Sequence, residues 1–127
     1  MKEDQNFFPP GTILSADVTV NQSEVVRDFY KKVIGWEHSE YKRGDYTDYF
    51  MTTTDGQPVA GICQRAGSLA DLPLAWLVYF GVKDLPASLE ECRNLGGKVL
   101  TEPQGEGRGS YAVIEYPVGA ICALSQF

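Results

Sequence analysis

Four side chains that could take part in chemistry stand in apolar or glycine-rich stretches. Asp17 lies in ILSADVTV, and Tyr79 lies 62 residues later in WLVYFGV. Arg108 lies in GEGRGS, where its guanidinium could hold a carboxylate or phosphate through two parallel hydrogen bonds. Cys63 would need a base to act as a nucleophile, and the only histidine, His38, is not obviously near it. The pattern favours ligand binding over nucleophilic catalysis.

Each of these residues also has a structural interpretation. Asp17 needs a partner in any case, and a neighbouring Tyr, Ser or Arg could satisfy it. Arg108 could be a solvated loop residue or could pair with Asp17 or Glu115. A buried, inert thiol is the favoured interpretation of Cys63, and an edge or surface position is favoured for His38.

The elements that position these residues follow from periodicity. Residues 12–20 alternate in polarity, which predicts a strand with one apolar face. A helix follows, with Ser23 as its expected N-cap and Gly35 at its end. Its apolar stripe has helical spacing and comprises Val25, Val26, Phe29 and Val33. Short strand-like runs lead to PVAGICQ, and Tyr46, Tyr49 and Phe50 put aromatic side chains on both faces of one of them.

The same order then restarts after a loop at 65–74. A strand at 75–82 precedes a helix at 84–97, and short strands follow in KVL, YAVIEYP and AICALSQ. The two copies align with an offset of 62, since Val20 falls on Val82 and Gly35 falls on Gly97. This repeat predicts a single domain at 12–126, after a tail at 1–11, with module one at 12–64, a linker at 65–74 and module two at 75–126.

Composition narrows the function classes. The chain has 127 residues and a net charge of −6, so nucleic acid and anionic membranes are not expected partners. No apolar run is long enough to span a membrane. Three cysteines without CxxC spacing predict a reduced, cytoplasmic protein.

The ordered motifs DFYKKVIGW, WLVYFGVKD, LGGKV and YPVGAICAL resemble those of the vicinal-oxygen-chelate superfamily, also called the glyoxalase/bleomycin-resistance/dioxygenase fold. The resemblance covers roughly residues 11–126. It implies an α+β fold in which two tandem βαβββ modules form a cupped, eight-stranded mixed sheet with helices outside. In metal-dependent members, His, Glu or Gln ligands from strands 1, 4, 5 and 8 line the cup.

The resemblance places those four ligand positions at Ser15, Gly61, Leu77 and Ala123. These residue types cannot build a His/carboxylate site, so neither a metal nor another cofactor is expected. Alternation along the strands then turns a set of small, polar and apolar side chains toward the cup. The expected ligand-binding residues are Asp17, Tyr79, Arg108, Leu77, Ile121, Ser15 and Cys63.

Three functions fit this pattern. The favoured one is a metal-free protein that binds a small organic molecule in the cup between its modules, as bleomycin-resistance-type relatives do. The alternatives are a metal-dependent lyase, isomerase or dioxygenase with unrecognised ligands, and a non-catalytic interaction subunit. A homodimer is expected, because relatives of this fold usually pair and the aromatic stretch DYTDYFM would be costly to leave open.

Overall fold

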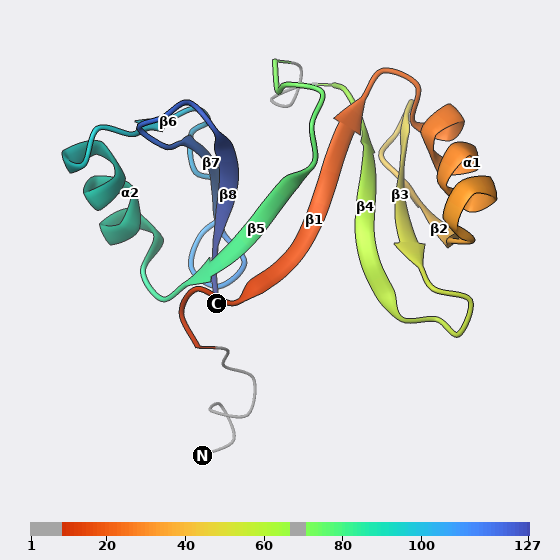
Figure 1. Cartoon of the computed structure of the whole chain (residues 1–127), viewed down its shortest axis with the longest axis horizontal. Coiled ribbons are helices and arrows are strands. Elements are labelled where there is room, and N and C mark those ends of the chain that lie inside the picture. The colour runs from red at the N-terminus through yellow and green to blue at the C-terminus, as the bar shows by residue number, and fades with distance from the viewer. Residues whose placement is uncertain (1–8, 67–70) are drawn as a thin grey trace. The chain divides into compact units, whose positions relative to one another are not determined.

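The computed structural model describes residues 9–66 and 71–127, and it contains the predicted order of elements twice (Figure 1). The expected tail at 1–11 and linker at 65–74 therefore lie partly outside the described residues. The first set is β1 (Ile13–Val20), α1 (Ser23–Ile34), β2 (Glu37–Lys42), β3 (Thr47–Thr52) and β4 (Pro58–Gln64). The second set is β5 (Leu77–Val82), α2 (Leu85–Asn94), β6 (Lys98–Val99), β7 (Tyr111–Glu115) and β8 (Ile121–Gln126).

Eight strands form a mixed sheet in the order β2-β3-β4-β1-β5-β8-β7-β6. The β1–β4 and β5–β8 pairs are parallel, and the other strand pairs within each set are antiparallel. This topology confirms the predicted fold class of two βαβββ modules with a mixed sheet and two helices. The offset of 62 also holds at the level of strand register. Asp17 pairs with Gly61 as Tyr79 pairs with Ala123, 62 residues further along in both strands.

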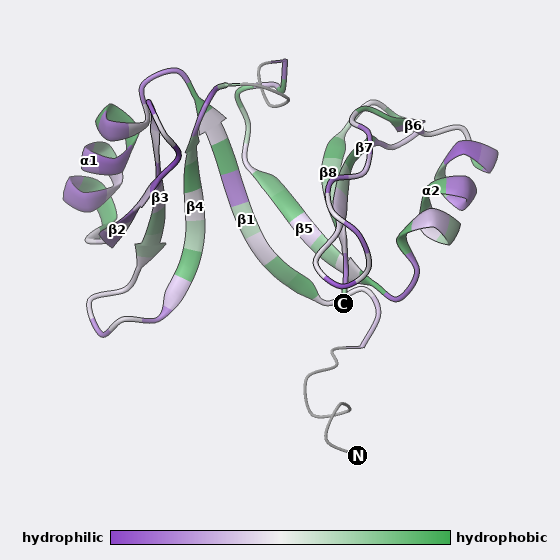
Figure 2. Cartoon of the chain, turned by 180° about the vertical axis from the view of Figure 1, so that it is seen from behind, coloured by the Kyte–Doolittle hydropathy of each residue, from purple (hydrophilic) through white to green (hydrophobic). Residues whose placement is uncertain are grey.

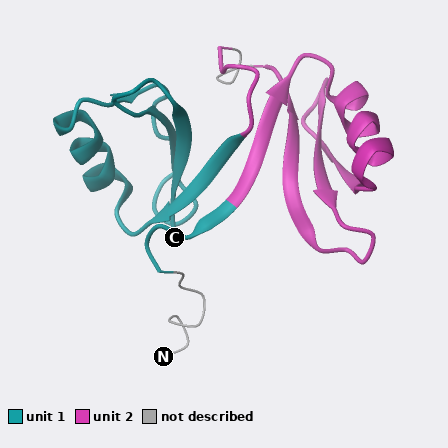
Figure 3. Ribbon diagram, in the orientation of Figure 1, with its two compact units in different colours: residues 1–14, 77–127 teal, residues 15–76 magenta. Residues whose placement is uncertain are grey.

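The chain divides into two compact units (Figure 3). Unit 1 comprises residues 1–14 and 77–127, and unit 2 comprises residues 15–76. The start of β1 belongs to unit 1, where Gly11 N–H donates to the carbonyl of Gly81 at 2.8 Å and Gly81 N–H donates to the carbonyl of Thr12 at 2.8 Å.

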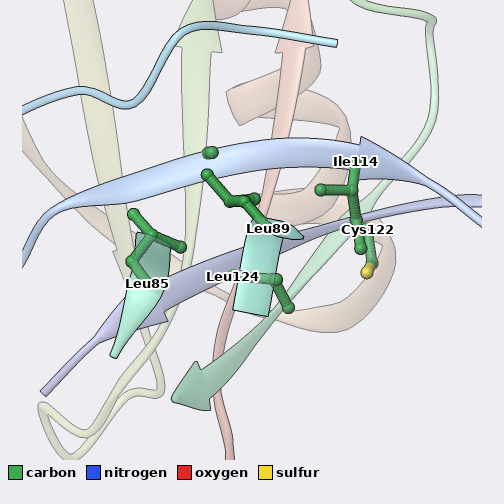
Figure 4. Close-up of a cluster of buried hydrophobic side chains, with 6 residues drawn as sticks. Leu85, Leu89, Ile114, Cys122 and Leu124 are labelled. Carbon is green, nitrogen blue, oxygen red and sulfur yellow. The ribbon is translucent and has the colours of Figure 1, made fainter. Parts of the chain in front are cut away.

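Each unit has its own apolar core on the helix-bearing face of its strands. In unit 2, Val18, Tyr49, Met51 and Ile62 form the buried cluster. In unit 1, the cluster joins α2 to β7 and β8, and Figure 4 shows Leu85 and Leu89 beside Leu124. Figure 2 shows the alternation of hydrophobic and hydrophilic residues along β1 and the mixed character of α1. Val18, Ile62 and Leu124 thus point to the helix-bearing side of their strands.

The start of each helix is capped by a glutamine from the last strand of the same unit. Gln64 Oε1 accepts a hydrogen bond from Ser23 N–H at 3.1 Å, and Gln126 Oε1 accepts one from Leu85 N–H at 2.6 Å. The prediction that Ser23 is the N-cap is therefore wrong. Ser23 is the first residue of α1, and its hydroxyl donates to the carbonyl of Thr47 at 3.1 Å. The glutamine oxygen thus satisfies a backbone N–H at the start of the helix, a group that is usually satisfied by a side chain close to it in sequence.

No helix in the described ranges has the length and apolar character needed to cross a lipid bilayer.

Candidate functional site

In unit 2, the sheet face opposite α1 carries the sequence-predicted residues Asp17 and Cys63. Register pairs Asp17 with Gly61 and Thr19 with Cys63, so both predicted residues project from the same side of the sheet. A Cβ atom added to Gly61 would lie 2.6 Å from Oδ1 of Asp17, so the carboxylate occupies the space above this glycine. We call this surface the helix-free face of unit 2; its members are Ser15, Asp17, Thr19, Tyr41, Asp48, Phe50, Gly61 and Cys63.

A stacked pair of aromatic rings lies on the same face. Tyr41 and Phe50 have ring centroids 5.6 Å apart and an interplanar angle of 18°. Their exposed fractions are 43% and 52%, although both are large apolar side chains. The guanidinium carbon of Arg43 lies 4.3 Å from the centroid of the Tyr41 ring. Arg43, Tyr41 and Phe50 thus form a series of planar groups, a geometry that suits cation–π contact and ring stacking.

Asp48 fixes this series to the sheet. Its Oδ2 accepts a hydrogen bond from Arg43 Nε at 2.6 Å, and its Oδ1 accepts one from the backbone N–H of Gln64 at 2.8 Å. The carboxylate is buried, so the two bonds compensate for its removal from water. The hydrogen bond to Asp48 also raises the pKa of Arg43, which keeps the guanidinium charged.

Sequence reasoning placed Phe50 on a strand with aromatic side chains on both faces but did not assign its face, and it missed Tyr41 and Arg43. The structure puts Tyr49 in the core and leaves Phe50 exposed on the opposite face, as alternation along β3 requires. Tyr41 pairs with Asp48 in the β2–β3 ladder, which brings it to the side that carries Phe50. The spacing of Tyr41 and Arg43 by two residues was the sequence feature that could have revealed them.

Cys63 has a strongly raised pKa. Burial of the thiol, followed by the negative charges of Asp17 and Asp48, raises the pKa from 9.0 to about 12. At neutral pH the sulfur is therefore protonated and a poor nucleophile, because the thiolate is the reactive form. Cys63 is therefore best described as an inert, partly buried residue whose side chain forms part of the helix-free face of unit 2.

The raised pKa predicts a loss of stability at alkaline pH. Between pH 9 and about 12 the unfolded state releases the Cys63 proton while the folded state retains it. The folded state then binds more protons, so the free energy of unfolding falls as pH rises, by up to about 1.4 kcal/mol per pH unit. Urea unfolding at pH 8, 9, 10 and 11 should show this fall, and Cys63→Ala should reduce the slope. An unchanged slope in that variant would contradict the assignment.

The predicted residues of the second module lie in unit 1. Leu77 is buried, Tyr79 and Ile121 are half-buried, and Arg108 is exposed in the loop before β7. The Tyr79 and Tyr111 rings have centroids 5.9 Å apart. The ring of Phe127 lies over Gly81, where an added Cβ would be 2.6 Å from two of its carbons. Aromatic side chains therefore cover the sheet around Tyr79 and Gly81 in unit 1.

The residues present do not fit the family's metal centre. Of its four positions, Gly61 has no side chain, Leu77 and Ala123 are buried and apolar, and Ser15 offers a single hydroxyl. Within residues 9–66 and 71–127, no three His, Cys, Asp or Glu side chains are grouped so that they could hold a metal ion. His38 lies elsewhere, on the helix-bearing side, with its ring 5.4 Å from that of Tyr49 and at 90° to it. Among the residues that the structure describes, the buried Nδ1 of His38 has no hydrogen-bond partner.

Two hollows lie at equivalent places in the two units. One, of about 460 Å³, adjoins the start of α1 and is lined in part by Ser23 and Gln64. The other, of about 450 Å³, adjoins the start of α2 and is lined in part by Leu85 and Gln126. In both, the glutamine already accepts the first backbone N–H of the helix. The glutamine in each hollow thus already serves as a helix cap.

Comparison with known proteins gives a family match over residues 12–121, to the model described as Glyoxalase/Bleomycin resistance protein/Dioxygenase superfamily. A curated relative, the anthracycline biosynthesis protein DauV of Streptomyces sp. (strain C5), is 30% identical over 111 residues. The match covers 87% of this chain and 40% of the relative, so the chain spans about two fifths of that protein's length.

Solved structures share the fold. A hypothetical protein of Bacillus halodurans C-125 matches with a TM-score of 0.64 and 13% identity, over 92% of this chain and 94% of the other. A variant of Streptomyces coelicolor methylmalonyl-CoA epimerase in complex with 2-nitronate-propionyl-CoA matches with a TM-score of 0.56 and 16% identity, over 93% and 98% of the two chains. At these identities the likeness concerns the fold alone.

Proposed function

The chain belongs to the Glyoxalase/Bleomycin resistance protein/Dioxygenase superfamily, and from this premise we propose that it binds a small, planar organic molecule on the helix-free face of unit 2. The observation that carries the proposal is the exposed, stacked pair of Tyr41 and Phe50, in which Phe50 lies one strand away from Gly61. A metal-dependent reaction has no comparable support, because the donor set does not fit the family's metal centre.

Stacking supplies the apolar part of the binding. The rings of Phe50 and Tyr41 lie in nearly parallel planes, and more than two fifths of each residue is exposed to water. Covering such rings with another planar group removes apolar surface from water and adds about 0.5–1.5 kcal/mol for each aromatic contact. Arg43 lies over the Tyr41 ring and is itself held by its hydrogen bond to Asp48. The two rings therefore need little reordering when a ligand binds.

Asp17 supplies the polar part. Phe50 and Asp17 both pair with Gly61, from β3 and β1 respectively, so they lie on either side of a position without a side chain. Neighbouring strands are about 4.8 Å apart, which places the two backbones about 10 Å apart. The carboxylate of Asp17 lies over Gly61 and takes up part of this span. A fused-ring ligand would therefore stack on Phe50 and present a hydroxyl or amino group at its edge, whose hydrogen bond the carboxylate can accept.

The curated relatives point to the same ligand class. Their names assign them to anthracycline biosynthesis, and anthracyclines are fused-ring molecules with hydroxyl groups. Because this chain spans 40% of each of them, only the ligand class is transferred, without the activity.

A fluorescence titration with an anthracycline tests the proposal. The wild-type protein should quench the fluorescence of the bound ring system in a saturable manner. Phe50→Ala should raise the dissociation constant about three- to tenfold, through the loss of one aromatic contact. The matched control is Tyr116→Ala, since Tyr116 is an exposed aromatic residue of unit 1 outside this face. Absence of binding, or equal affinities in the wild-type and Phe50→Ala proteins, would contradict the proposal.

A further inference from the structure

Gly61 stands in the middle of β4, where the backbone does not require a glycine. Its φ is not positive, so any L-amino acid could adopt this backbone conformation. A glycine inside a strand also loses more conformational entropy on folding than other residues and offers no side chain to pack, so it weakens the sheet. What the glycine supplies at this position is therefore space.

The second module carries an alanine at the equivalent position. Gly61 pairs with Asp17 in the parallel β1–β4 ladder, and Ala123 pairs with Tyr79 in the parallel β5–β8 ladder. Ala123 has no exposed surface, so its methyl group is accommodated within the packed structure. The same strand geometry thus accepts a methyl group in unit 1, and the two ladders differ in the residue that faces it.

The carboxylate of Asp17 occupies the space that a side chain at position 61 would need. A Cβ added to Gly61 would lie 2.6 Å from Oδ1 and 3.2 Å from Cγ of Asp17. Both atoms belong to the end of a side chain, so an alanine would push the carboxylate aside and leave the strand in place. Phe50 pairs with Gly61 from β3, so a carboxylate above Gly61 lies about one strand spacing, 4.8 Å, from the Phe50 backbone.

The next step rests on the proposed function: we propose that Gly61 is the positioning residue of the ligand site, whose missing side chain lets Asp17 reach over β4 toward a ring stacked on Phe50. The geometry also narrows the ligand class. At one strand spacing, the carboxylate can accept a hydrogen bond from a hydroxyl or amino group on the stacked ring or on the ring fused directly to it. A molecule whose only donor lies further away would not meet the carboxylate.

Titration of Gly61→Ala with the anthracycline used for the wild type tests the proposal. The dissociation constant should rise about fivefold or more, the low end of the range for losing one hydrogen bond. In an Asp17→Ala background the same substitution should change the dissociation constant less than about twofold, because no carboxylate is left to displace. Equal affinities of the wild-type and Gly61→Ala proteins, or an equal loss in both backgrounds, would overturn the proposal. A wild-type protein that does not bind the anthracycline would instead contradict the proposed function.

The Cys63 thiol reports the position of the carboxylate without any ligand. Asp17 contributes to the raised pKa of Cys63, which lies two residues from Gly61 on the same face of β4. An alanine that pushes the carboxylate off β4 should therefore make the thiol titrate at lower pH, and it should have no such effect in the Asp17→Ala background. The rate of alkylation of the Cys63 peptide against pH, followed by mass spectrometry, isolates this thiol. An unchanged titration in Gly61→Ala would overturn the proposal.

Urea unfolding of the same four proteins separates positioning from a loss of fold. If the collision with the carboxylate lowers the unfolding midpoint of Gly61→Ala, adding Asp17→Ala should restore it, because the added methyl group then has no carboxylate to meet. A double variant as unstable as Gly61→Ala would place the collision elsewhere and would also overturn the proposal.

Discussion

Replacing Met51 with alanine should lower the free energy of unfolding by about 2–5 kcal/mol, the range for truncating a buried Leu, Ile or Met. Met51 has no exposed surface and lies in the core of unit 2 with Val18, Tyr49 and Ile62. Its neighbours belong to different strands and cannot all move to fill the cavity. Chemical denaturation followed by circular dichroism measures the loss.

Two controls sharpen this test. Met51→Leu keeps most of the side-chain volume and should cost less than about 1.5 kcal/mol. Phe50→Ala removes the adjacent residue of the same strand, whose side chain is 52% exposed on the other face. Phe50→Ala should lower the free energy of unfolding much less than Met51→Ala does, and it should weaken binding of the proposed ligand. Equal losses of stability in Met51→Ala and Phe50→Ala would contradict the assignment of the two faces.

Replacing Asp17 with alanine should raise the dissociation constant of the proposed ligand about 5- to 150-fold. This corresponds to about 1–3 kcal/mol, the cost of leaving a buried polar group without its hydrogen-bond partner. The carboxylate lies above Gly61, beside the stacked rings, where it can accept a donor from the edge of a planar ligand. Titration of the variant with an anthracycline, under the conditions used for the wild type, measures the effect.

Asp17→Asn separates charge from hydrogen bonding, because the amide oxygen still accepts a bond. The control is Glu90→Ala, which removes an exposed acid of α2 in unit 1 and should leave the affinity unchanged. Asp17 also contributes to the raised pKa of Cys63. The Cys63 thiol should therefore titrate at lower pH in Asp17→Ala than in the wild type. This shift would show, independently of ligand binding, that the carboxylate lies near Cys63. Wild-type affinity in Asp17→Ala would exclude Asp17 from the site.

Much of the fold follows from the sequence because its two halves repeat. The offset inferred from Val20 and Val82 reappears in the strand registers, where Val20 pairs with Gln64 and Val82 pairs with Gln126. The cap of α1 was not predictable in the same way, because Gln64 lies 41 residues from the helix start that it caps. The periodicity of α1 revealed apolar residues but could not say which of them meet the sheet, since Val25 and Val26 are equally apolar.

The candidate site was only partly accessible to sequence reasoning. Alternation along β1 and β4 correctly placed Asp17 and Cys63 on the same side of the sheet, because the register of a parallel pair fixes facing positions. The contribution of Tyr41 depends on how β2 pairs with β3, and the pairing of short strands around a turn is weakly specified by residue type. Arg43 became interpretable only through its contacts with Tyr41 and Asp48.

The path of the chain through its two units sets an order for its folding during synthesis. Unit 2 is continuous, from residue 15 to residue 76, and all of its strands are available once Trp76 has left the ribosome. Unit 1 takes residues from both sides of unit 2, and Gly11 and Thr12 find their partner only when Gly81 appears. A protease cut at the 76–77 junction would therefore not release two whole units, because the first segment of unit 1 would remain attached to unit 2.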